Sequence, residues 1–311
     1  MAQKMTIDEL RLFQALPLDV KIMKSQQRIR EWVNYYGEDG VYISFSGGKD
    51  STVLLDLVRG LYPNIEAVFS DTGLEFPEIR EFVKTIDNVT WIKPDLTFRK
   101  VIEKCGYPII GKEQAKWIGE MQRKITPQAF RKNMLGVQLD GSKTKYKVSE
   151  RWMYMIDAPF KIGSGCCTEM KKKPLHKFAK ESGKVPFIGT MAEESMLRTQ
   201  QWLRTGCNAF DNHHAVSMPM AFWTEADVWA YIKQEGLRYS SIYDKGYART
   251  GCIFCLFGCH LESKPTRFQQ LQKTHPTLWR YCLKDWEKGG LGMREVLEFY
   301  GIPYENYSIE E

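Results

Sequence analysis

The hexapeptide Ser46-Gly47-Gly48-Lys49-Asp50-Ser51 has the residue types of a phosphate-binding loop. It follows an apolar run at residues 41–45 that predicts a buried strand, and it leads into a pattern at residues 51–61 that predicts a helix. At such a junction, free backbone amides and the positive end of the helix dipole can hold an anion. The glycines allow close approach of phosphate oxygens, Lys49 adds a cation, and Ser46 and Ser51 add hydroxyl donors. The alternative is a tight strand-to-helix turn that binds nothing.

Two aspartates near this loop are candidate metal ligands. Asp50 carries the wrong charge to bind phosphate directly, so we expect it to hold Mg2+ or to orient the loop. Asp71-Thr72-Gly73 comes just after the next predicted strand, at residues 65–69. Because open parallel sheets bind ligands at the carboxyl ends of their strands, we expect Asp71, Thr72 and Gly73 to contact the nucleotide or its metal. Capping of the following helix by Asp71 is the alternative.

Strand and helix patterns alternate along the chain. Further strands are predicted at residues 89–92 and 185–189, and a further helix follows Pro77. Short apolar strands separated by amphipathic helices predict an α/β fold with a doubly wound, mostly parallel sheet covered on both faces. Helical patterns at residues 6–36 and 265–304 predict N- and C-terminal helical extensions. Thr224 with Asp227 predicts a capping box at the start of another helix.

The positive charge of the chain is concentrated in one stretch. The net charge over all 311 residues is +6, but residues 112–184 hold 17 Lys or Arg against 7 Asp or Glu. Such a stretch can attract a polyanion, either a nucleotide or a nucleic acid, and a solvated lysine-rich surface is the alternative. Residues 127–149 have few apolar anchors, which predicts a long loop. Without a run of 18 apolar residues or a signal-peptide pattern at residues 1–6, we expect a cytoplasmic protein with no membrane partner.

Several ordered blocks resemble the PAPS/APS reductase family, and the hexapeptide resembles the PP-loop of the adenine nucleotide alpha-hydrolase superfamily. The blocks are Asp71-Thr72-Gly73 with Phe76-Pro77-Glu78, Cys166-Cys167 with Lys171 and Pro174-Leu175, residues 189–195 with Arg198, Pro219 with residues 223–229, residues 243–247, and Gly251-Cys252-Ile253-Phe254-Cys255. The resemblance implies a nucleotide-binding domain at 41–260 with a basic insertion at about 112–150, a helical cap at 1–40 and a helical extension at 261–311. It also implies that Gly189 contacts the nucleotide and that Lys49, Asp50, Asp71 and Arg198 act in catalysis.

Five of the eight cysteines lie in two groups. Cytosolic thiols stay reduced, so structural disulfides are not expected, and the isolated Cys105, Cys207 and Cys282 should be small buried hydrophobes. In the cluster-bearing branch of the resembled family, a Cys-Cys pair and a later Cys-x-x-Cys hold a [4Fe-4S] cluster, which implies Cys166, Cys167, Cys252 and Cys255 as ligands here. Zinc in a four-cysteine site and a metal-free structural role are the alternatives. Cys259 or His260 could replace a ligand, act as a redox or sulfur-carrying group beside the cluster, or be a turn residue packed under it.

Three departures from the sulfonucleotide reductases favour ATP as the substrate. Those reductases carry a nucleophilic cysteine in a Glu-Cys-Gly-like tail, whereas the last cysteine here is Cys282, in a helix-like segment. The hexapeptide matches the ATP-cleaving members of the superfamily rather than the altered loop of the reductases. Finally, Met191 and Ala192 stand where the reductases place arginines.

These departures lead us to expect an ATP pyrophosphatase that activates an acceptor as an adenylate for sulfur transfer, by analogy with the cluster-bearing enzyme of DNA phosphorothioation. Lys49, Mg2+ and the loop amides would stabilise the leaving pyrophosphate. The basic stretch makes tRNA or DNA a candidate acceptor, and a sulfur donor protein is a candidate partner. The alternatives are an APS or PAPS reductase that uses Cys259 or another internal thiol, and a non-catalytic nucleotide sensor.

Overall fold

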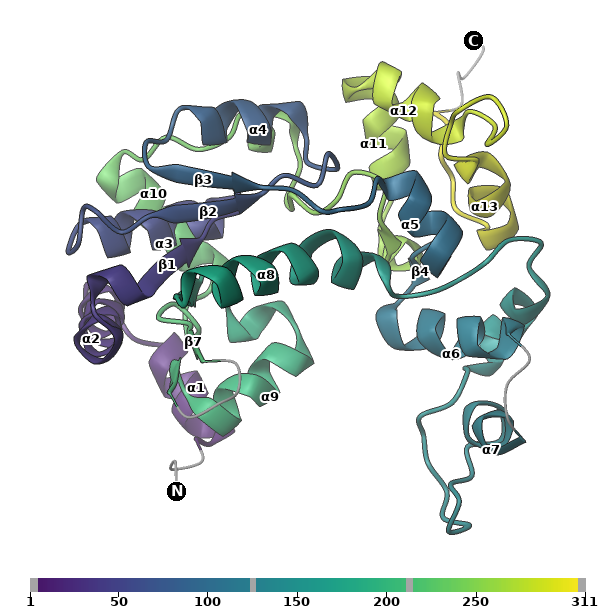
Figure 1. Cartoon of the computed structure of the whole chain (residues 1–311), viewed down its shortest axis with the longest axis horizontal. Helices are drawn as coiled ribbons and strands as arrows, with labels where there is room; N and C mark the ends of the chain where they lie inside the picture. Colours follow the sequence, from purple (N-terminus) through teal and green to yellow (C-terminus); the bar gives the residue numbers. More distant parts are fainter. Residues whose placement is uncertain (1–4, 124–126, 211–214, 307–311) are drawn as a thin grey trace. The chain divides into compact units, whose positions relative to one another are not determined.

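The computed structural model describes residues 5–123, 127–210 and 215–306 (Figure 1). The chain forms two compact units that are interleaved along the sequence. Unit 1 comprises Met1–Asp71, Glu75–Pro94 and Lys173–Gly251, and unit 2 comprises Thr72–Leu74, Asp95–Lys172 and Cys252–Glu311. The linear division into residues 1–40, 41–260 and 261–311 stays a prediction about the family domain. Within the described ranges, no helix combines the length and the apolar composition needed to cross a membrane.

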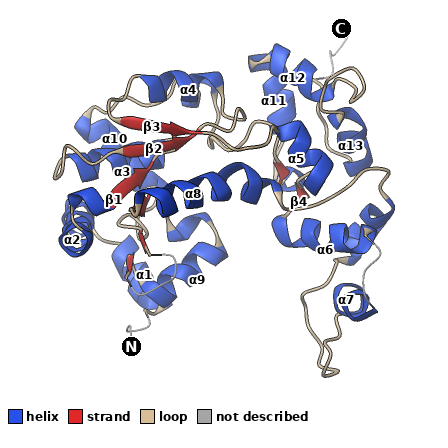
Figure 2. Cartoon of the chain, viewed as in Figure 1, coloured by secondary structure: helices blue, strands red, loops and turns tan. Residues whose placement is uncertain are grey.

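Unit 1 is built around a six-stranded sheet (Figure 2). Its strands are β1 Val41–Ser44, β2 Ala67–Ser70, β3 Val89–Ile92, β5 Val185–Ile188, β6 Asn208–Ala209 and β7 Val216–Ser217. Their order is β3-β2-β1-β5-β7-β6, and every pairing is parallel except that of β6 with β7. Ile43 in the central strand β1 pairs with Ala67 of β2 on one side and with Phe187 of β5 on the other. The predicted mostly parallel α/β sheet is confirmed.

Helices lie on both faces of this sheet. They are α1 Ile7–Gln14, α2 Leu18–Tyr36, α3 Lys49–Arg59, α4 Pro77–Lys84, α8 Lys173–Ser182, α9 Met196–Thr205 and α10 Glu225–Glu235. In Figure 1, α8 crosses in front of the strands, while α3 and α10 lie behind them. The helical pattern at residues 6–36 is two helices rather than one, because Pro17 has no amide hydrogen to continue α1 and instead precedes α2. The capping box at Thr224 is confirmed, since Asp227 Oδ2 accepts the Thr224 amide at 2.7 Å and Thr224 Oγ1 accepts the Asp227 amide at 3.3 Å.

The core of unit 1 explains why β1 reads as a continuous apolar run. Val41, Tyr42 and Ile43 are all nearly inaccessible, because helices cover the strand on both faces. Val53 and Leu54 of α3 are fully buried as well. The hexapeptide is therefore attached to a rigid strand at one end and to a packed helix at the other.

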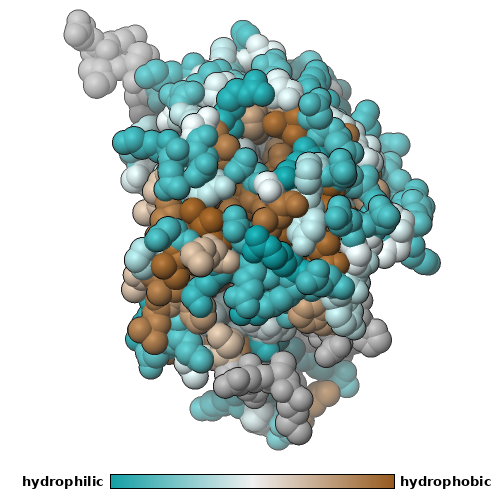
Figure 3. Space-filling view, turned by 90° about the vertical axis from the view of Figure 1, so that its left-hand side faces the viewer, coloured by the Kyte–Doolittle hydropathy of each residue, from teal (hydrophilic) through white to brown (hydrophobic). Residues whose placement is uncertain are grey.

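Part of the surface is apolar. Figure 3 shows one side of the molecule, on which hydrophobic residues form a band among hydrophilic ones. The large apolar side chains that α1 and α2 leave exposed are Ile7, Leu12, Met23 and Tyr35. Exposed apolar side chains are common on folded domains, because polar side chains cannot cover the whole surface, so these four do not by themselves indicate a function.

Unit 2 is mostly helical, with one short parallel pair of strands. Its strands are β4 Ile109–Ile110 and β8 Leu256–Phe257, and its helices are α5 Phe98–Cys105, α6 Lys112–Gln122, α7 Pro127–Phe130, α11 Arg267–Thr274, α12 Pro276–Leu283 and α13 Met293–Tyr300. The predicted C-terminal helical extension is confirmed as α11 to α13. The predicted loop at 127–149 is only partly irregular, because α7 and a π-helical turn at Arg131–Leu135 occupy its first part.

Candidate functional site

The hexapeptide forms a turn that its own side chains hold in place. Ser46 Oγ and Ser51 Oγ lie 3.0 Å apart, and the Ser46 amide donates to Ser51 Oγ at 3.2 Å. Ser51 Oγ in turn donates to the Gly48 carbonyl at 2.9 Å, as does Thr52 Oγ1 at 3.0 Å. These bonds fix the backbone of the loop before any ligand binds, so little conformational entropy is lost on binding.

Three glycines at this site have no room for a larger residue. Gly47 has a φ of +71°, and a Cβ atom there would lie 2.7 Å from Val83 Cγ2. A Cβ atom on Gly48 would lie 2.7 Å from Thr250 Oγ1, and one on Gly189 would lie 3.0 Å from the Asp50 carbonyl oxygen. Gly189 therefore lets the end of β5 pack against the first turn of α3, and its predicted contact with a nucleotide stays a prediction.

Lys49 is a buried cation with two carboxylate neighbours. It is 5% exposed, and its Nζ lies 3.4 Å from Asp50 Oδ1 and 3.2 Å from Glu225 Oε1. Burial alone would lower the pKa of Lys49, but Asp50, Tyr243 and Glu225 outweigh burial and raise it. The Lys49 amide donates to the Tyr243 hydroxyl at 2.8 Å, and that hydroxyl lies 3.3 Å from Thr250 Oγ1. Lys49 is thus charged, and its backbone is held from outside the loop.

Glu225, Tyr243 and Thr250 support the loop, but the sequence analysis does not identify them as site residues. Tyr243 stands in a block that carries the family resemblance, which is the only signal that could have drawn attention to it. Its contact with Lys49 joins residues 194 positions apart, and no local pattern predicts such a contact.

Asp50 is suited to hold a cation. Burial raises the pKa of Asp50 against the opposing charge of Lys49, and Glu194 and Glu225 raise it further. Asp50 Oδ1 is buried and accepts no hydrogen bond from the residues that the structure describes, although Lys49 Nζ lies 3.4 Å away. A carboxylate oxygen with free lone pairs is the ligand type that Mg2+ prefers, so this residue fits the predicted metal.

Asp71 and Arg198, the other two predicted catalytic residues, each form an ion pair. Asp71 follows β2, is 5% exposed, and accepts a hydrogen bond from Arg80 Nη2 at 2.9 Å. It does not cap the next helix, because the N-cap residue of α4 is Phe76. Arg198 lies on α9 and pairs with Glu194.

Thr72 and Gly73 belong to unit 2, although they follow Asp71 directly in the sequence. Thr72 Oγ1 accepts the Leu74 amide at 3.2 Å, and Gly73 has a φ of +72°. Together they form a tight turn directly after the strand end. Their predicted contact with the nucleotide stays a prediction.

The four predicted cluster ligands line one small pocket of unit 2, the cysteine pocket. The pocket is lined by Cys166, Cys167, Cys252 and Cys255 together with Leu74, Phe98, Pro108, Met170 and Lys171. Cys166 and Cys167 precede a π-helical turn at Thr168–Lys172, and Cys255 directly precedes β8, with its amide donating to the Cys252 carbonyl at 3.1 Å. Two cysteine pairs separated by 84 residues in the sequence are thereby brought together.

The chemistry of this pocket fits an iron-sulfur cluster. Four thiol side chains in apolar surroundings are the usual donor set of a [4Fe-4S] cluster. In the ranges that the structure describes, however, no group of three or more His, Cys, Asp or Glu side chains is already arranged as a metal site. The four cysteines that could act as ligands therefore line one pocket, but in the described residues their thiols do not already have the geometry of a metal site.

Nearby lysines favour a thiolate in the cysteine pocket. A hydrogen bond from Cys166, helped by the charges of Lys112, Lys171 and Lys172, lowers the pKa of Cys167 despite its burial. The same hydrogen bond, together with burial, raises the pKa of Cys166. The thiolate is the form of cysteine that binds a metal, so these positive charges favour a metal-binding form of Cys167.

Arg267 anchors the segment that carries Cys255. Its guanidinium donates to the Cys255 carbonyl at 2.8 Å and to the Phe257 carbonyl at 3.2 Å, and its Nε donates to Glu262 Oε1 at 2.6 Å. Cys259 is 1% exposed, and its thiol lies 3.6 Å from the Cys255 carbonyl. Cys259 and the adjacent His260 line a different cavity from the four pocket cysteines.

The isolated cysteines are only partly as expected. Cys282 is fully buried in α12, and its thiol donates to the Trp279 carbonyl at 3.1 Å. Cys105 and Cys207 are half-buried rather than buried, because one ends α5 and the other lies in the turn after α9. None of the three lines the cysteine pocket.

A mostly parallel sheet with a glycine-rich loop at the end of its central strand is typical of an α/β protein of the PP-loop type. The family model of the phosphoadenosine phosphosulfate reductase domain matches residues 40–117 and 120–256, so the chain belongs to that family.

Relatives in sequence support this assignment. The chain is 27% identical over 263 residues to an adenosine 5'-phosphosulfate reductase from Staphylococcus haemolyticus, covering 81% of this chain and 85% of the relative. It is 26% identical over 266 residues to an uncharacterized protein from Methanocaldococcus jannaschii, covering 84% of this chain. The chain spans 43% of the length of that archaeal protein and 49% of a second one from the same organism.

Solved structures with a similar course of the chain are more distant. A phosphoadenylyl-sulfate reductase from Candida auris, in a phosphate complex, has a TM-score of 0.45 at 16% identity, covering 81% of this chain and 98% of that one. An FMN adenylyltransferase from Candida glabrata has a TM-score of 0.44 at 12% identity, covering 79% of this chain and 68% of that one.

Proposed function

We propose that this chain is an ATP pyrophosphatase that adenylylates an acceptor for sulfur transfer. An acceptor oxygen attacks the α-phosphorus of ATP, the bond from that phosphorus to the β-phosphate breaks, and pyrophosphate leaves. The acceptor loses its proton and becomes an adenylate, from which a sulfur nucleophile then displaces AMP. The observation that carries this proposal is the self-supported loop in which the buried Lys49 lies beside Asp50.

The loop residues supply electrostatic stabilisation rather than covalent chemistry. The Lys49 ammonium and the positive end of the α3 dipole would hold the pyrophosphate as negative charge develops on it, while the Ser46 and Lys49 amides stay bonded to Ser51 Oγ and to the Tyr243 hydroxyl. Asp50 Oδ1 would hold the Mg2+ that enters with ATP, and the metal would neutralise phosphate charge. Asp71 and Arg198 complete the proposed catalytic set, and Asp71 already accepts a hydrogen bond from Arg80.

Cys166, Cys167, Cys252 and Cys255 would hold a [4Fe-4S] cluster. When bound, the cluster would carry sulfur, transfer electrons or stabilise the local structure. The surrounding lysines would keep Cys167 in the ligating thiolate form, and Arg267 would fix the backbone on which Cys255 stands.

Product analysis with ATP labelled at the α-phosphate tests this proposal. Anaerobically purified protein with Mg2+ should release AMP and pyrophosphate, and tRNA or single-stranded DNA added as acceptor should raise the rate. Lys49→Met should lower the rate of AMP formation about 100- to 1,000-fold, whereas Lys177→Met, on the exposed surface of α8, should leave it unchanged. Saturable ATP binding with no AMP under any acceptor condition would instead identify a nucleotide sensor.

A sulfonucleotide reductase is the second candidate, because several relatives of this chain are named adenosine 5'-phosphosulfate reductase. Such a reaction needs a nucleophilic thiolate. Burial raises the pKa of Cys259 to about 12 and likewise that of Cys282 to about 12, which disfavours both thiols as nucleophiles. Release of labelled sulfite from APS in the presence of thioredoxin would support the reductase over the pyrophosphatase.

A further inference from the structure

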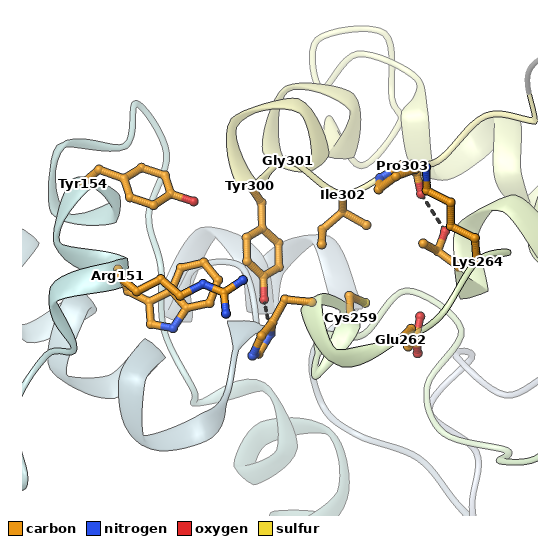
Figure 4. A pocket seen from close by; sticks show the side chains of 12 residues that line it. Arg151, Tyr154, Cys259, Glu262, Lys264, Tyr300, Gly301, Ile302 and Pro303 are labelled. Atoms are coloured by element: carbon orange, nitrogen blue, oxygen red, sulfur yellow. Dashed lines mark hydrogen bonds between the residues drawn. The ribbon is translucent and has the colours of Figure 1, made fainter.

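A second cavity in unit 2 has no part in the chemistry proposed above. It has a volume of about 270 Å³ and is lined by the 3-10 helix Glu150–Asp157, the turn Cys259–Leu261 and the end of α13 (Figure 4). We name it the aromatic–basic pocket after six of its side chains, which are Arg151, Trp152, Tyr154, His260, Lys264 and Tyr300. The volume lies just below the usual range of small-molecule sites and suits one planar ring with a charged group.

Aromatic rings line one wall of the pocket. The Trp152 ring lies 5.0 Å from the His260 ring and 5.5 Å from the Tyr300 ring, in edge-to-face contacts that hold it in place. Tyr154 lies 6.3 Å from Trp152 and is 44% exposed, so its ring remains accessible to a ligand. Trp152 and Tyr300 are buried, at 7% and 4% exposure, so Tyr154 is the ring of this wall that a nucleic-acid base can reach and stack on.

Two cations at the pocket have no acidic partner. The Arg151 guanidinium lies 4.6 Å from the centre of the Trp152 ring, and Lys264 is exposed to solvent. In the part of the chain that the structure describes, neither side chain forms an ion pair. The one carboxylate that lines the pocket, that of Glu262, is already bound by Arg267. The pocket is therefore positively charged and open to an anion.

His260 adds one directed polar group. Its Nδ1 lies 2.7 Å from the Tyr300 hydroxyl, which Figure 4 draws as a dashed line. This bond fixes the plane of the imidazole and leaves Nε2 as the ring nitrogen that can bind a ligand. The pocket thus combines one accessible aromatic ring, that of Tyr154, with unpaired cations and a fixed hydrogen-bonding group.

We infer that the aromatic–basic pocket binds one nucleotide unit, with its base stacked on Tyr154 and its anionic group attracted by Arg151 and by Lys264, which lie at opposite ends of the pocket (Figure 4). The surrounding sequence has the same charge preference, since residues 112–172 hold 13 Lys or Arg against 6 Asp or Glu. The unit could be a free nucleotide or part of a single-stranded nucleic acid. The idea that this pocket binds the sulfur acceptor rests on the proposed function. The inference that it binds a nucleotide does not depend on that function.

Fluorescence anisotropy of labelled 12-nucleotide single-stranded RNA and DNA, with the full chain and without ATP, tests the inference. We expect saturable binding that weakens at least about fivefold in each of Arg151→Ala, Lys264→Ala and Tyr154→Ala. Because all three side chains are exposed, these variants should fold normally, which thermal melting checks. Lys273→Ala is the matched control, since it removes an exposed lysine of α11 that does not line the pocket, and it should change affinity less than about twofold.

A competition experiment with mononucleotides distinguishes a free nucleotide from a nucleic acid as the ligand. If AMP, CMP, GMP or UMP displaces the oligonucleotide, the pocket accepts a free nucleotide; if only a longer strand competes, the ligand is a nucleic acid. Equal weakening in the control and pocket variants would mean non-specific attraction to the basic surface and would overturn the inference, as would the absence of binding. Because the assay contains no ATP, an absence of oligonucleotide binding would not contradict the pyrophosphatase proposal. An absence of ATP cleavage would likewise not contradict nucleotide binding in this pocket.

Discussion

The phosphate loop of unit 1 and the cysteine pocket of unit 2 are built in opposite ways. The loop is contiguous in sequence, and Ser46 and Ser51 hold it through bonds within six residues. The cysteine pocket joins two segments separated by 84 residues, and apolar side chains surround its thiols. The loop takes its shape from its own hydrogen bonds. The cysteine pocket, in contrast, would reach its final geometry only when a metal group binds to its thiols. The two sites should therefore respond differently to single substitutions.

The largest effect should follow from removing one pocket cysteine. Cys252→Ser leaves three thiols, so we expect the anaerobically purified variant to lose nearly all of the brown iron-sulfur absorbance of the parent protein. Cys282→Ser is the matched control, because Cys282 lies in the same unit but outside the pocket, and it should keep the colour. A colourless parent protein with stoichiometric zinc would refute the cluster assignment.

Removing the loop cation should have the next largest effect. Lys49→Met keeps most of the side-chain volume in a buried position but leaves Asp50 and Glu225 without a partner. Loss of a preorganised charge in catalysis typically costs about 100- to 1,000-fold in kcat, and we expect a loss of this size in AMP formation. Because the cluster belongs to the other unit, its absorbance should not change. A variant with parental kcat would show that Lys49 does not act on the leaving group.

Adding a methyl group to the loop at Gly48 should have an intermediate effect on the affinity for ATP. Gly48→Ala places a methyl group 2.7 Å from Thr250 Oγ1, so Thr250 must move and the loop loses part of its support. Steric strain of this kind should weaken ATP binding about tenfold in a calorimetric titration. The double variant with Thr250→Ala should recover part of that loss, and Gly111→Ala, where nothing lies within 4 Å, is the neutral control. If the double variant binds no better than Gly48→Ala alone, the assumed steric cause is wrong.

The smallest effect should follow from deleting one supporting hydroxyl. Tyr243→Phe removes the acceptor of the Lys49 amide and leaves the ring in place. A hydrogen bond of this type contributes about 1 kcal/mol, so we expect an approximately fivefold weaker affinity for ATP and an unchanged cluster. An effect as large as that of Lys49→Met would mean that the loop depends on outside support rather than on its own bonds.

The same contrast explains how much could be predicted from the sequence. β3 was predictable residue for residue at 89–92, and the hexapeptide was predictable as a turn between a strand and a helix, because apolar runs and glycines act locally. The break in the N-terminal helical pattern lies at Pro17, because apolar periodicity alone continues across a residue that cannot donate a helical hydrogen bond.

Contacts between distant residues account for the rest. The support of Lys49 by Tyr243 and Glu225 and the assignment of residues 72–74 to unit 2 depend on tertiary packing, which no short window of sequence contains. The role of Cys166, Cys167, Cys252 and Cys255 as ligands is predicted only through family resemblance, since the spacing of two distant pairs does not by itself show that they meet.

Calorimetric titration of the protein with a non-hydrolysable ATP analogue bridged by a methylene between the α- and β-phosphates, in the presence of Mg2+, tests most directly whether the loop holds two linked phosphates. The account predicts saturable binding that pyrophosphate competes away and that Lys49→Met weakens, and it predicts only weak binding of APS, which has no β-phosphate. Tight binding of APS together with a flat trace for the ATP analogue would contradict it.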